Sequence, residues 1–375
     1  MKFLFQFGNN FSLSQAEIAA RFPELFFEKK MGNFALFSGE KSSKYEKKFS
    51  ELGGAIRFFE VFSETDFSRI SAEISDFLRQ KIPTGKILFG ILAPGKFRRK
   101  ILLETKKNLK KSGRSARFLN RDFRNLDAGT LFREKLFSAE KAAEIAVLPA
   151  GGKFFLAETR AAQNVEDFAT RDFGKPVRDM AVGMLPPKIA LAMTNFSADE
   201  KGNLPAKIWD PFCGTGTILI EAARLGISVF GSDISQKMIA ASNKNFVHFF
   251  PKKAAEIFWH DATTKIPQKV SDAVVVSEGF LGPIFRAPLS DAQFFAAKKK
   301  VEPIFQKFFA AAQKAKISKI VISMPFWRLQ NGKNGFCKNT LDFAKTFWKN
   351  DLAVRFRREN QIVGREILVF RDVPR

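Results

Sequence analysis

The sequence predicts an α/β protein whose C-terminal half forms a doubly wound sheet ending in an antiparallel hairpin, preceded by smaller α+β units. Strand and helix patterns alternate from residue 188 onward, which is typical of a sheet covered by helices on both faces. A glycine-containing turn at residues 210–217 joins the first of these strands to a helix. The last two strand patterns flank a turn rather than a helix, which predicts the terminal hairpin.

In the first half, short strands alternate with short helices, which predicts α+β units rather than one large parallel sheet. Strands are predicted at residues 3–7, 34–37, 55–61, 116–119 and 154–159, and helices at 14–21, 71–78 and 98–110. Residues 160–178 are polar with scattered charges, which predicts a loop. We therefore place the domain boundary near residue 165.

The second half predicts a longer alternation of elements. Helices are predicted at residues 188–195, 218–225, 236–245, 303–315 and 341–348. Strands are predicted at residues 206–209, 228–231, 257–259, 272–276, 317–323, 353–357 and 366–370. The apolar strand at 272–276 is expected to be buried on both faces.

Composition excludes several classes of protein. The chain has 375 residues, 62 Lys+Arg against 38 Asp+Glu and a formal charge of +24, which favours a polyanionic partner. It has 45 Phe but one Tyr, so phenylalanine supplies most aromatic packing. Two cysteines and two histidines provide neither a disulfide scaffold nor a metal-ligand spacing, so we expect no metal. No apolar run approaches a membrane span and no secretory hydrophobic region begins the chain, so a cytoplasmic protein is expected. A monomer is a separate expectation that these observations do not test.

The positive charge is concentrated. Residues 96–124 carry 12 basic side chains against Glu104 and Asp122, a net charge of +10. A helix with a cationic outer face and guanidinium groups at a helix–strand junction predict contacts with nucleic-acid phosphates. The alternative interpretation is a solvated helix face. The candidate RNA-binding residues are Lys96, Arg98, Arg99, Lys107, Lys111, Arg114, Arg117 and Lys135.

The turn at residues 210–217 reads Asp-Pro-Phe-Cys-Gly-Thr-Gly-Thr. Gly214 and Gly216 permit a tight turn with close backbone approach to a ligand, and Asp233, 17 residues beyond Gly216, is placed to accept from ribose hydroxyls. Leu219 stands where a dinucleotide-binding motif has its third glycine. An acid at position 210 suits a cationic ligand, such as the methionine part of S-adenosylmethionine.

Residues 210–217 and 231–234 resemble motifs I and II of the Rossmann-like methyltransferases. Residues 183–188, Gly-Met-Leu-Pro-Pro-Lys, resemble the upstream motif of the tRNA guanosine-N2 methyltransferases, which carry a ferredoxin-like N-terminal domain and a THUMP domain. Residues 52–56, 112–118, 159–176 and 361–366 also resemble elements of that family. The resemblance implies a ferredoxin-like region at 1–60, a THUMP-like domain at 61–165 and a methyltransferase domain with its linker at 166–375.

The same resemblance implies S-adenosylmethionine as cofactor. The backbone of the turn is expected to hold its methionine end, Asp233 its ribose, and Asp261 with Ala262 its adenine. The implied cofactor-binding residues are Asp210, Pro211, Phe212, Gly214, Thr215, Gly216, Thr217, Asp233, Ile234, Asp261 and Ala262. For each acid, the alternative is an aspartate that only caps a turn.

The catalytic motif departs from the family. The family places Asp, Asn or Ser before Pro-Pro and an aromatic residue, whereas residues 277–283 read Ser-Glu-Gly-Phe-Leu-Gly-Pro. The catalytic candidates are Ser277, Glu278 and Phe280. In one hypothesis Glu278 accepts from the substrate amine. In the other, the loop serves another base, or catalysis is lost and binding remains.

The function expected from this resemblance is methylation of a guanosine N2 in tRNA, of the position-10 type, with the N-terminal half docking the tRNA. Two alternatives stay open. One is a DNA amino-methyltransferase, and the other is a tRNA-binding protein with a catalytically altered methyltransferase domain.

Overall fold

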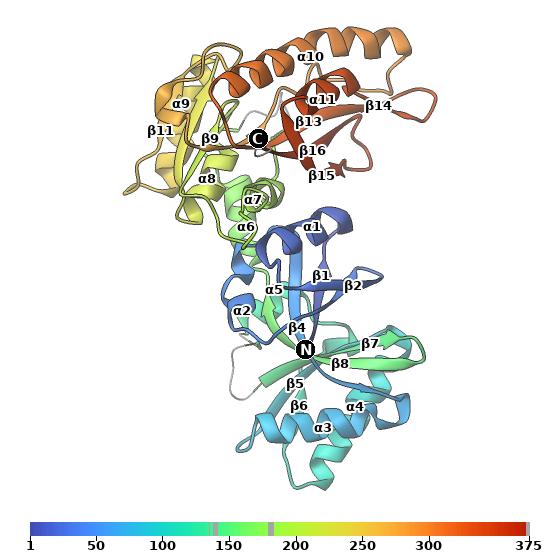
Figure 1. The fold of residues 1–375 in the computed structure, drawn as a ribbon. Helices are drawn as coiled ribbons and strands as arrows, with labels where there is room; N and C mark the ends of the chain where they lie inside the picture. Colours follow the sequence, from blue (N-terminus) through green and yellow to red (C-terminus); the bar gives the residue numbers. More distant parts are fainter. Residues whose placement is uncertain (135, 138–141, 179–183, 373–375) are drawn as a thin grey trace. The chain divides into compact units, whose positions relative to one another are not determined.

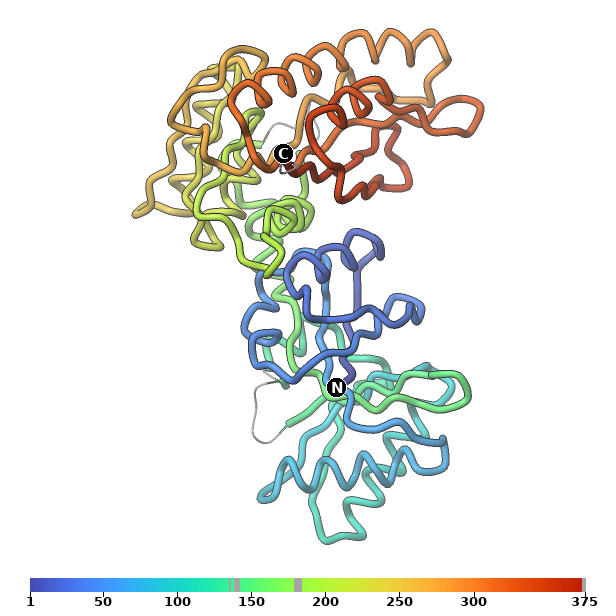
Figure 2. Tube along the Cα trace, viewed as in Figure 1, coloured from blue at the N-terminus to red at the C-terminus, as the bar shows by residue number. Residues whose placement is uncertain are grey.

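The computed structural model describes residues 1–134, 136–137, 142–178 and 184–372. The chain divides into two compact units (Figure 1). The first contains Met1–Phe11 and Glu24–Phe168, and the second contains Ser12–Pro23 and Ala169–Arg375. The chain therefore passes from one unit to the other three times, and its course can be followed in Figure 2.

The first unit is built on one eight-stranded sheet with the order β2-β3-β1-β4-β8-β7-β5-β6. Its strands are β1 (Lys2–Phe7), β2 (Phe26–Met31), β3 (Phe34–Ser38), β4 (Ala55–Thr65), β5 (Ile87–Leu92), β6 (Ala116–Phe118), β7 (Ala142–Ala150) and β8 (Lys153–Ala162). Only the β5–β6 and β5–β7 pairs are parallel. The predicted boundary at residue 60 falls inside β4, so both predicted N-terminal regions share this sheet.

Helices cover this sheet where their apolar stripes match it. The helices of this unit are α2 (Lys44–Lys47), α3 (Ile70–Lys81), α4 (Gly95–Lys111) and α5 (Ala128–Arg133), and the two units divide within α6 (Val165–Phe173). Ile74 of α3 and Leu102 of α4 pack with Phe89 and Ile145 of the sheet. The helix α4 confirms the predicted cationic helix, with Ile101, Leu102 and Leu109 buried and most of its basic residues exposed.

The loop expected at residues 160–178 is wrong, because β8 continues to Ala162 and α6 follows. The Asn164 side chain accepts from the backbone N–H of Asp167 at 3.1 Å and so satisfies the start of the helix. Acidic residues occupy the first turn of α6, and the basic Arg171 lies in the last. These charges favour the helix dipole, and Arg171 is buried and forms an ion pair with the buried Glu221 at 2.6 Å.

The second unit confirms the predicted doubly wound sheet with a terminal antiparallel hairpin. The strand order is β11-β10-β9-β12-β13-β16-β15, parallel as far as β13 and antiparallel beyond it. The strands are β9 (Lys207–Asp210), β10 (Ser228–Asp233), β11 (Glu256–Trp259), β12 (Val274–Glu278), β13 (Lys319–Arg328), β14 (Asn334–Phe336), β15 (Trp348–Phe356) and β16 (Val363–Asp372). The order reverses between β9 and β12, which marks the carboxyl ends of these strands as the ligand-binding edge.

Helices form a layer on each face of this sheet. They are α7 (Pro187–Asn195), α8 (Thr217–Arg224), α9 (Gln236–Phe249), α10 (Asp291–Lys314) and α11 (Lys338–Lys345). Trp209 of β9 packs with Phe305 of α10, whereas its neighbour Ile208 packs with Ile218 of α8. This alternation along a buried strand produces two apolar cores, one on each side.

Helix α10 begins twelve residues before the predicted start at residue 303. Ser290 and Gln293 form a capping box at its N-terminus, and Pro303 lies inside the helix. The prediction was wrong because a proline was taken as a helix start, whereas the fold tolerates the one hydrogen bond that Pro303 cannot form.

Helix α1 (Phe11–Arg21) is assigned to the second unit although the strands before and after it belong to the first. Leu13 lies in the same core as α7 and α8. Glu17 accepts from the Asn195 amide at 2.6 Å, and the Arg21 guanidinium donates to the Gly202 carbonyl at 2.6 Å. These contacts are buried, so α1 completes the second unit.

Among the described residues, no helix is both long and apolar enough to cross a membrane.

Candidate active site

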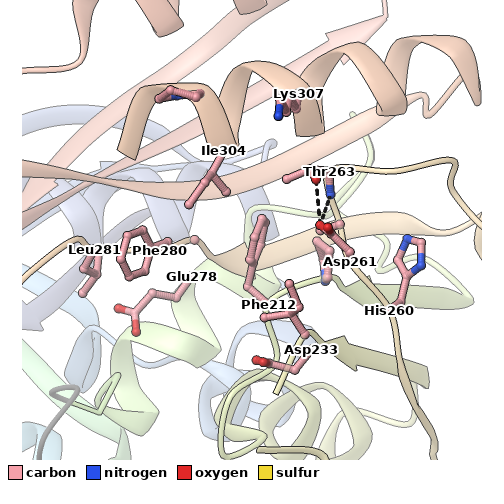
Figure 3. Close-up of a pocket in the computed structure, with 15 residues that line it drawn as sticks. Phe212, Asp233, His260, Asp261, Thr263, Glu278, Phe280, Leu281, Ile304 and Lys307 are labelled. Atoms are coloured by element: carbon pink, nitrogen blue, oxygen red, sulfur yellow. Dashed lines mark hydrogen bonds between the residues drawn. The ribbon is translucent and has the colours of Figure 1, made fainter. Parts of the chain in front are cut away.

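A pocket of about 510 Å³ opens at the carboxyl ends of β9, β10, β11 and β12 (Figure 3). Eight of the predicted site residues line it, namely Pro211, Phe212, Asp233, Ile234, Asp261, Ala262, Glu278 and Phe280. The remaining predicted residues, Asp210, Gly214, Thr215, Gly216, Thr217 and Ser277, are not part of this lining. In Figure 3, Glu278 and Phe280 lie toward one end of the pocket, and His260 and Asp261 toward the other.

The predicted turn needs glycine at positions 214 and 216. Gly214 and Gly216 have φ values of 50° and 82°, in the left-handed region that favours glycine. A Cβ on Gly216 would lie 2.5 Å from the Ser242 hydroxyl, so the turn also needs glycine for close packing. The turn therefore brings backbone groups next to the pocket and starts α8.

Asp233 is held at the end of β10 by two backbone donors. Its Oδ2 accepts from the N–H of Gly214 at 3.0 Å and its Oδ1 from the N–H of Ser235 at 2.9 Å. The carboxylate thus ties the glycine turn to the next strand and also lines the pocket. Its turn-capping role and its ligand-facing position coexist.

Asp261 has a similar arrangement after β11. Burial would raise the pKa of its carboxyl, but hydrogen bonds from the backbone N–H of Thr263 at 2.9 Å and its hydroxyl at 2.7 Å outweigh burial. The pKa of Asp261 therefore lies below its ordinary value, and the carboxylate remains an acceptor. Figure 3 draws both bonds.

Asp210 and Ser277 form a buried pair. The Ser277 hydroxyl donates to Asp210 Oδ1 at 2.5 Å, and the N–H of Phe212 donates to the same oxygen at 3.1 Å. Burial raises the pKa of Asp210 to about 8, against the effect of these two donors. Ser277 is fully buried and its hydroxyl is bonded to Asp210, so it supports the strand ends from inside the sheet.

Glu278 and Phe280 lie where the catalytic motif was expected. Arg365 of β16 donates through Nε to Glu278 Oε1 and forms an ion pair with it. Burial raises the pKa of Glu278, and Arg365 opposes that rise. The Phe280 side chain is 40% exposed, which leaves its ring available for stacking.

Gly279 explains part of the departure from the family motif. Its N–H donates to the Ser323 carbonyl at 3.1 Å, a bond that a proline could not form. A Cβ at this position would lie 2.4 Å from Cε1 of Phe305. The surrounding core therefore accepts glycine and excludes the family's proline.

Several pocket residues escaped the sequence prediction, among them His260, Thr263, Ile304 and Lys307. His260 Nε2 is buried and has no hydrogen-bond partner among the described residues, and burial lowers the pKa of this imidazole. The signal for His260 was its place directly before Asp261 at a strand end. Lys307 had no such signal, because it lies inside a predicted helix and away from the motifs at the strand ends.

The segment before α7 is tied to the glycine turn. Lys175 is buried, and its Nζ donates to Thr217 Oγ1 at 2.6 Å. Asn245 of α9 donates to the carbonyls of Val177 and Thr215 at 2.9 Å and accepts from the N–H of Val177 at 2.8 Å. The turn is thus fixed from two sides. Gly183 of the predicted upstream motif lies outside the described residues.

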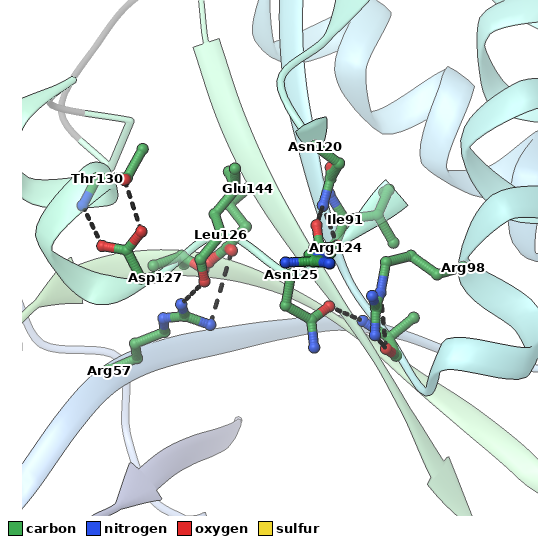
Figure 4. A network of polar contacts seen from close by, with 12 residues as sticks. Arg57, Ile91, Arg98, Asn120, Arg124, Asn125, Leu126, Asp127, Thr130 and Glu144 are labelled. Atoms are coloured by element: carbon green, nitrogen blue, oxygen red, sulfur yellow. Dashed lines mark hydrogen bonds and ion pairs between the residues drawn. The ribbon is translucent and has the colours of Figure 1, made fainter. Parts of the chain in front are cut away.

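The basic side chains of the first unit divide into two groups. Arg98 donates to the carbonyls of Ala93 and Phe123 at 2.7–3.0 Å, as part of the network in Figure 4. Arg114 donates to the carbonyls of Ile82 and Gly85 at 2.7 and 3.0 Å. These two arginines hold backbone together. Exposed members of the predicted set are Lys96, Arg99, Lys107, Lys111 and Arg117, whereas Lys135 lies outside the described residues.

The pocket fits S-adenosylmethionine. Phe212, Ile234 and Ala262 supply apolar surface, and Asp233 and Asp261 place two carboxylates at neighbouring strand ends. The glycine turn admits close backbone approach. The part of the chain that the structure describes brings together no group of three side chains suited to a metal ion.

Residues 176–278 match the family model described as RMKL-like, methyltransferase domain. A tRNA (guanine(10)-N2)-dimethyltransferase from Methanothermobacter thermautotrophicus is 43% identical over 67 residues, which are 18% of this chain and 19% of that protein. The enzyme of the same name from Pyrococcus abyssi is 32% identical over 124 residues, 33% of this chain and 31% of that protein. The matched segments thus span less than a third of each relative.

The fold also has a whole-chain counterpart. The crystal structure of SMU.472, a putative methyltransferase complexed with SAH, covers 100% of this chain and 98% of its own, with a TM-score of 0.50 and 14% identity. At this identity the likeness concerns the fold alone. Residues 176–278 are thus similar to an RMKL-like methyltransferase domain, and the fold of the chain has a counterpart among solved structures.

Proposed function

We propose that the chain is an S-adenosylmethionine-dependent tRNA methyltransferase that modifies the exocyclic N2 amine of a guanosine, of the position-10 type. One observation carries the proposal: a single pocket is lined by the cofactor-type carboxylates Asp233 and Asp261 and by the motif residues Glu278 and Phe280. The match to a methyltransferase domain and the two similar tRNA (guanine(10)-N2)-dimethyltransferases support it.

At the cofactor end, the backbone of residues 211–216 holds the methionine part, and Asp233 accepts from the ribose hydroxyls. Asp261, kept ionised by Thr263, accepts from the adenine amine, beside Ala262. When bound, the cofactor supplies an electrophilic methyl group on a sulfonium, whose S–C bond breaks as the N–C bond to guanine forms.

At the substrate end, the chain must activate a poor nucleophile, because the lone pair of the guanine N2 is delocalised into the ring. Glu278 accepts a hydrogen of N2, which favours a pyramidal amine, and is placed to take the proton that N2 releases. Phe280 stacks on the base and fixes its plane. Both side chains line the pocket next to the cofactor end.

The tRNA body docks on the first unit through the exposed basic surface of α4 and β6. Lys107, Lys111 and Arg117 are exposed there and carry the phosphate contacts. Arg98 and Arg114 instead hold the local backbone in place.

The decisive experiment is nucleoside mass spectrometry of unmodified tRNA incubated with the full chain and labelled S-adenosylmethionine. We expect labelled N2-methylguanosine or N2,N2-dimethylguanosine. Faster methylation of duplex DNA in a competition assay would instead favour a DNA amino-methyltransferase. Absence of cofactor binding in calorimetry would favour a tRNA-binding protein without activity.

A further inference from the structure

The two carboxylate oxygens of Glu278 have different surroundings. Oε1 receives the Nε–H of Arg365, while Oε2 forms no hydrogen bond to any described residue. The Glu278 side chain is 18% exposed and lines the pocket, whereas that of Arg365 is 5% exposed and does not. The ion pair therefore connects the edge of the pocket to the antiparallel part of the sheet.

Arg365 reaches this position because of the strand order. In β12–β13 pairing, Glu278 stands opposite Ser323, and in β13–β16 pairing, Arg365 stands opposite Pro325. Gly364 lets β16 approach, because a Cβ there would lie 2.2 Å from the Phe326 ring. Burial of a guanidinium is costly unless it is paired, so the site is built around the contact with Glu278.

The family motif restrains its amine acceptor differently. There, a short side chain precedes two prolines, so the backbone itself is stiff. Here Glu278 has one more rotatable bond than aspartate and is followed by Gly279, the most flexible residue type. A free glutamate side chain loses rotamer entropy when it is fixed in one orientation. A partner that fixes it beforehand removes that cost from the reaction.

We propose that Arg365 is a positioning residue for methyl transfer: it holds Oε1 of Glu278 so that Oε2 faces the substrate amine. This inference rests on the proposed function and adds to it the element that replaces the missing prolines. Arg365 acts through Glu278 and contacts neither substrate nor cofactor.

Charge supports the same role. The charged or titratable groups that interact with Glu278 are Arg365 from β16 and Asp210 from β9. Burial raises the pKa of Glu278 and Arg365 opposes the rise, so loss of Arg365 raises this pKa further. A protonated carboxyl is a weaker acceptor for the amine hydrogen. Loss of Arg365 therefore harms both orientation and ionisation.

The test compares Arg365→Met and Arg365→Gln with wild type in single-turnover methyl transfer to tRNA. Misplacement of a catalytic group by about 1 Å costs about 10²-fold in rate, so we expect Arg365→Met to lose about that factor at pH 7 with unchanged KM for tRNA. The acidic limb of its pH–rate profile shifts to higher pH, so the difference in rate from wild type becomes smaller as pH rises. Adding Arg365→Met to Glu278→Gln lowers the rate no further.

Arg371→Met is the matched control. Arg371 lies on the same strand and forms ion pairs with Glu200 and Asp351, and it does not line the pocket. We expect this variant to keep the wild-type rate and pH profile. If Arg365→Met fails to fold, Arg365→Gln, which keeps a hydrogen-bond donor but no charge, decides the question. A wild-type rate and pH profile in the folded Arg365 variant would overturn the inference.

A second readout separates this inference from the proposed function. The Glu278 carboxyl carbon can be titrated by NMR in ¹³C-glutamate-labelled protein, with Glu278→Gln identifying its signal. We expect its titration midpoint to rise in the Arg365 variants and to stay in Arg371→Met. If wild type does not methylate guanosine, the proposed function fails while this titration still tests the Glu278–Arg365 pair. An unchanged midpoint overturns the pairing.

Discussion

Substitutions that add a side chain at position 279, among them the proline of the family motif, should lower the free energy of unfolding. A Cβ on Gly279 would lie 2.4 Å from both Cε1 and Cζ of Phe305, whose ring is fully buried between α10 and the sheet. Gly279 does not have a left-handed φ, so the cost of Gly279→Ala is steric rather than conformational. Overpacking of a core costs about 1–3 kcal/mol, and we expect the free energy of unfolding to fall by that amount.

Gly279→Pro should cost more. It adds the loss of the N–H bond to the buried carbonyl of Ser323, worth about 1–3 kcal/mol when the acceptor is left unpaired. Urea unfolding of the full chain, with methyl transfer assayed in parallel, measures both variants. We expect Gly279→Ala to be less stable than wild type and Gly279→Pro to be the least stable of the three.

A compensating substitution tests the cause. Phe305→Leu removes the ring atoms Cε1 and Cζ that approach position 279 most closely. In the double variant with Gly279→Ala, the destabilisation should be smaller than the sum of the two single effects. Additive effects, or a Gly279→Ala variant as stable as wild type, would refute the steric explanation.

Three further predictions concern groups around the site and the RNA surface. The pKa of Asp210 is raised to about 8, so the folded state keeps a proton that the unfolded state loses above about pH 4. The free energy of unfolding of wild type, measured in urea, should therefore fall relative to that of Asp210→Asn between pH 5 and 8. An equal pH dependence in the two proteins would contradict this. Asn245→Ala leaves backbone groups of the glycine turn and its neighbouring segment unpaired. Calorimetry should therefore show weaker cofactor binding, and urea unfolding should show a free energy of unfolding lower by about 1–3 kcal/mol. Unchanged cofactor affinity would argue against a role of Asn245 in holding the turn. The double variant Lys107→Gln/Lys111→Gln should reduce the slope of log affinity for tRNA against log salt concentration by about 1.5 without changing Tm. As a control, Arg98→Gln should lower Tm, because it leaves two backbone carbonyls without their donor. An unchanged slope in the double variant would show that α4 does not contact the tRNA.

Local patterns predicted most of the second unit. A buried strand, a glycine turn and a helix are decided by residues close in sequence, so β9, the turn and α8 lie within a residue or two of their predicted bounds. Asp233 and Asp261 could be placed in one site because the carboxyl ends of parallel strands share an edge. Spacing along the sequence thus indicated the glycine turn and Asp233, whereas the role of Asp261 came from the family resemblance.

Long-range contacts could not be predicted. Arg365 lies 87 residues from Glu278, and the two meet only because β16 is inserted antiparallel beside β13. Charge counting also could not show that Arg98 and Arg114 use their guanidinium groups to bind backbone carbonyls. Pro303 misplaced the start of α10, because propensity is overridden when the rest of a helix packs well.

The assignment of α1 to the second unit has a consequence for dissecting the protein. A fragment that starts at Ala169 lacks Leu13, Glu17 and Arg21, so it exposes the apolar surface that α1 covers and leaves the Asn195 amide without its carboxylate partner. A fragment ending at Phe168 carries α1 away from the core that stabilises it. No single cut therefore separates the two units, because their segments alternate along the chain.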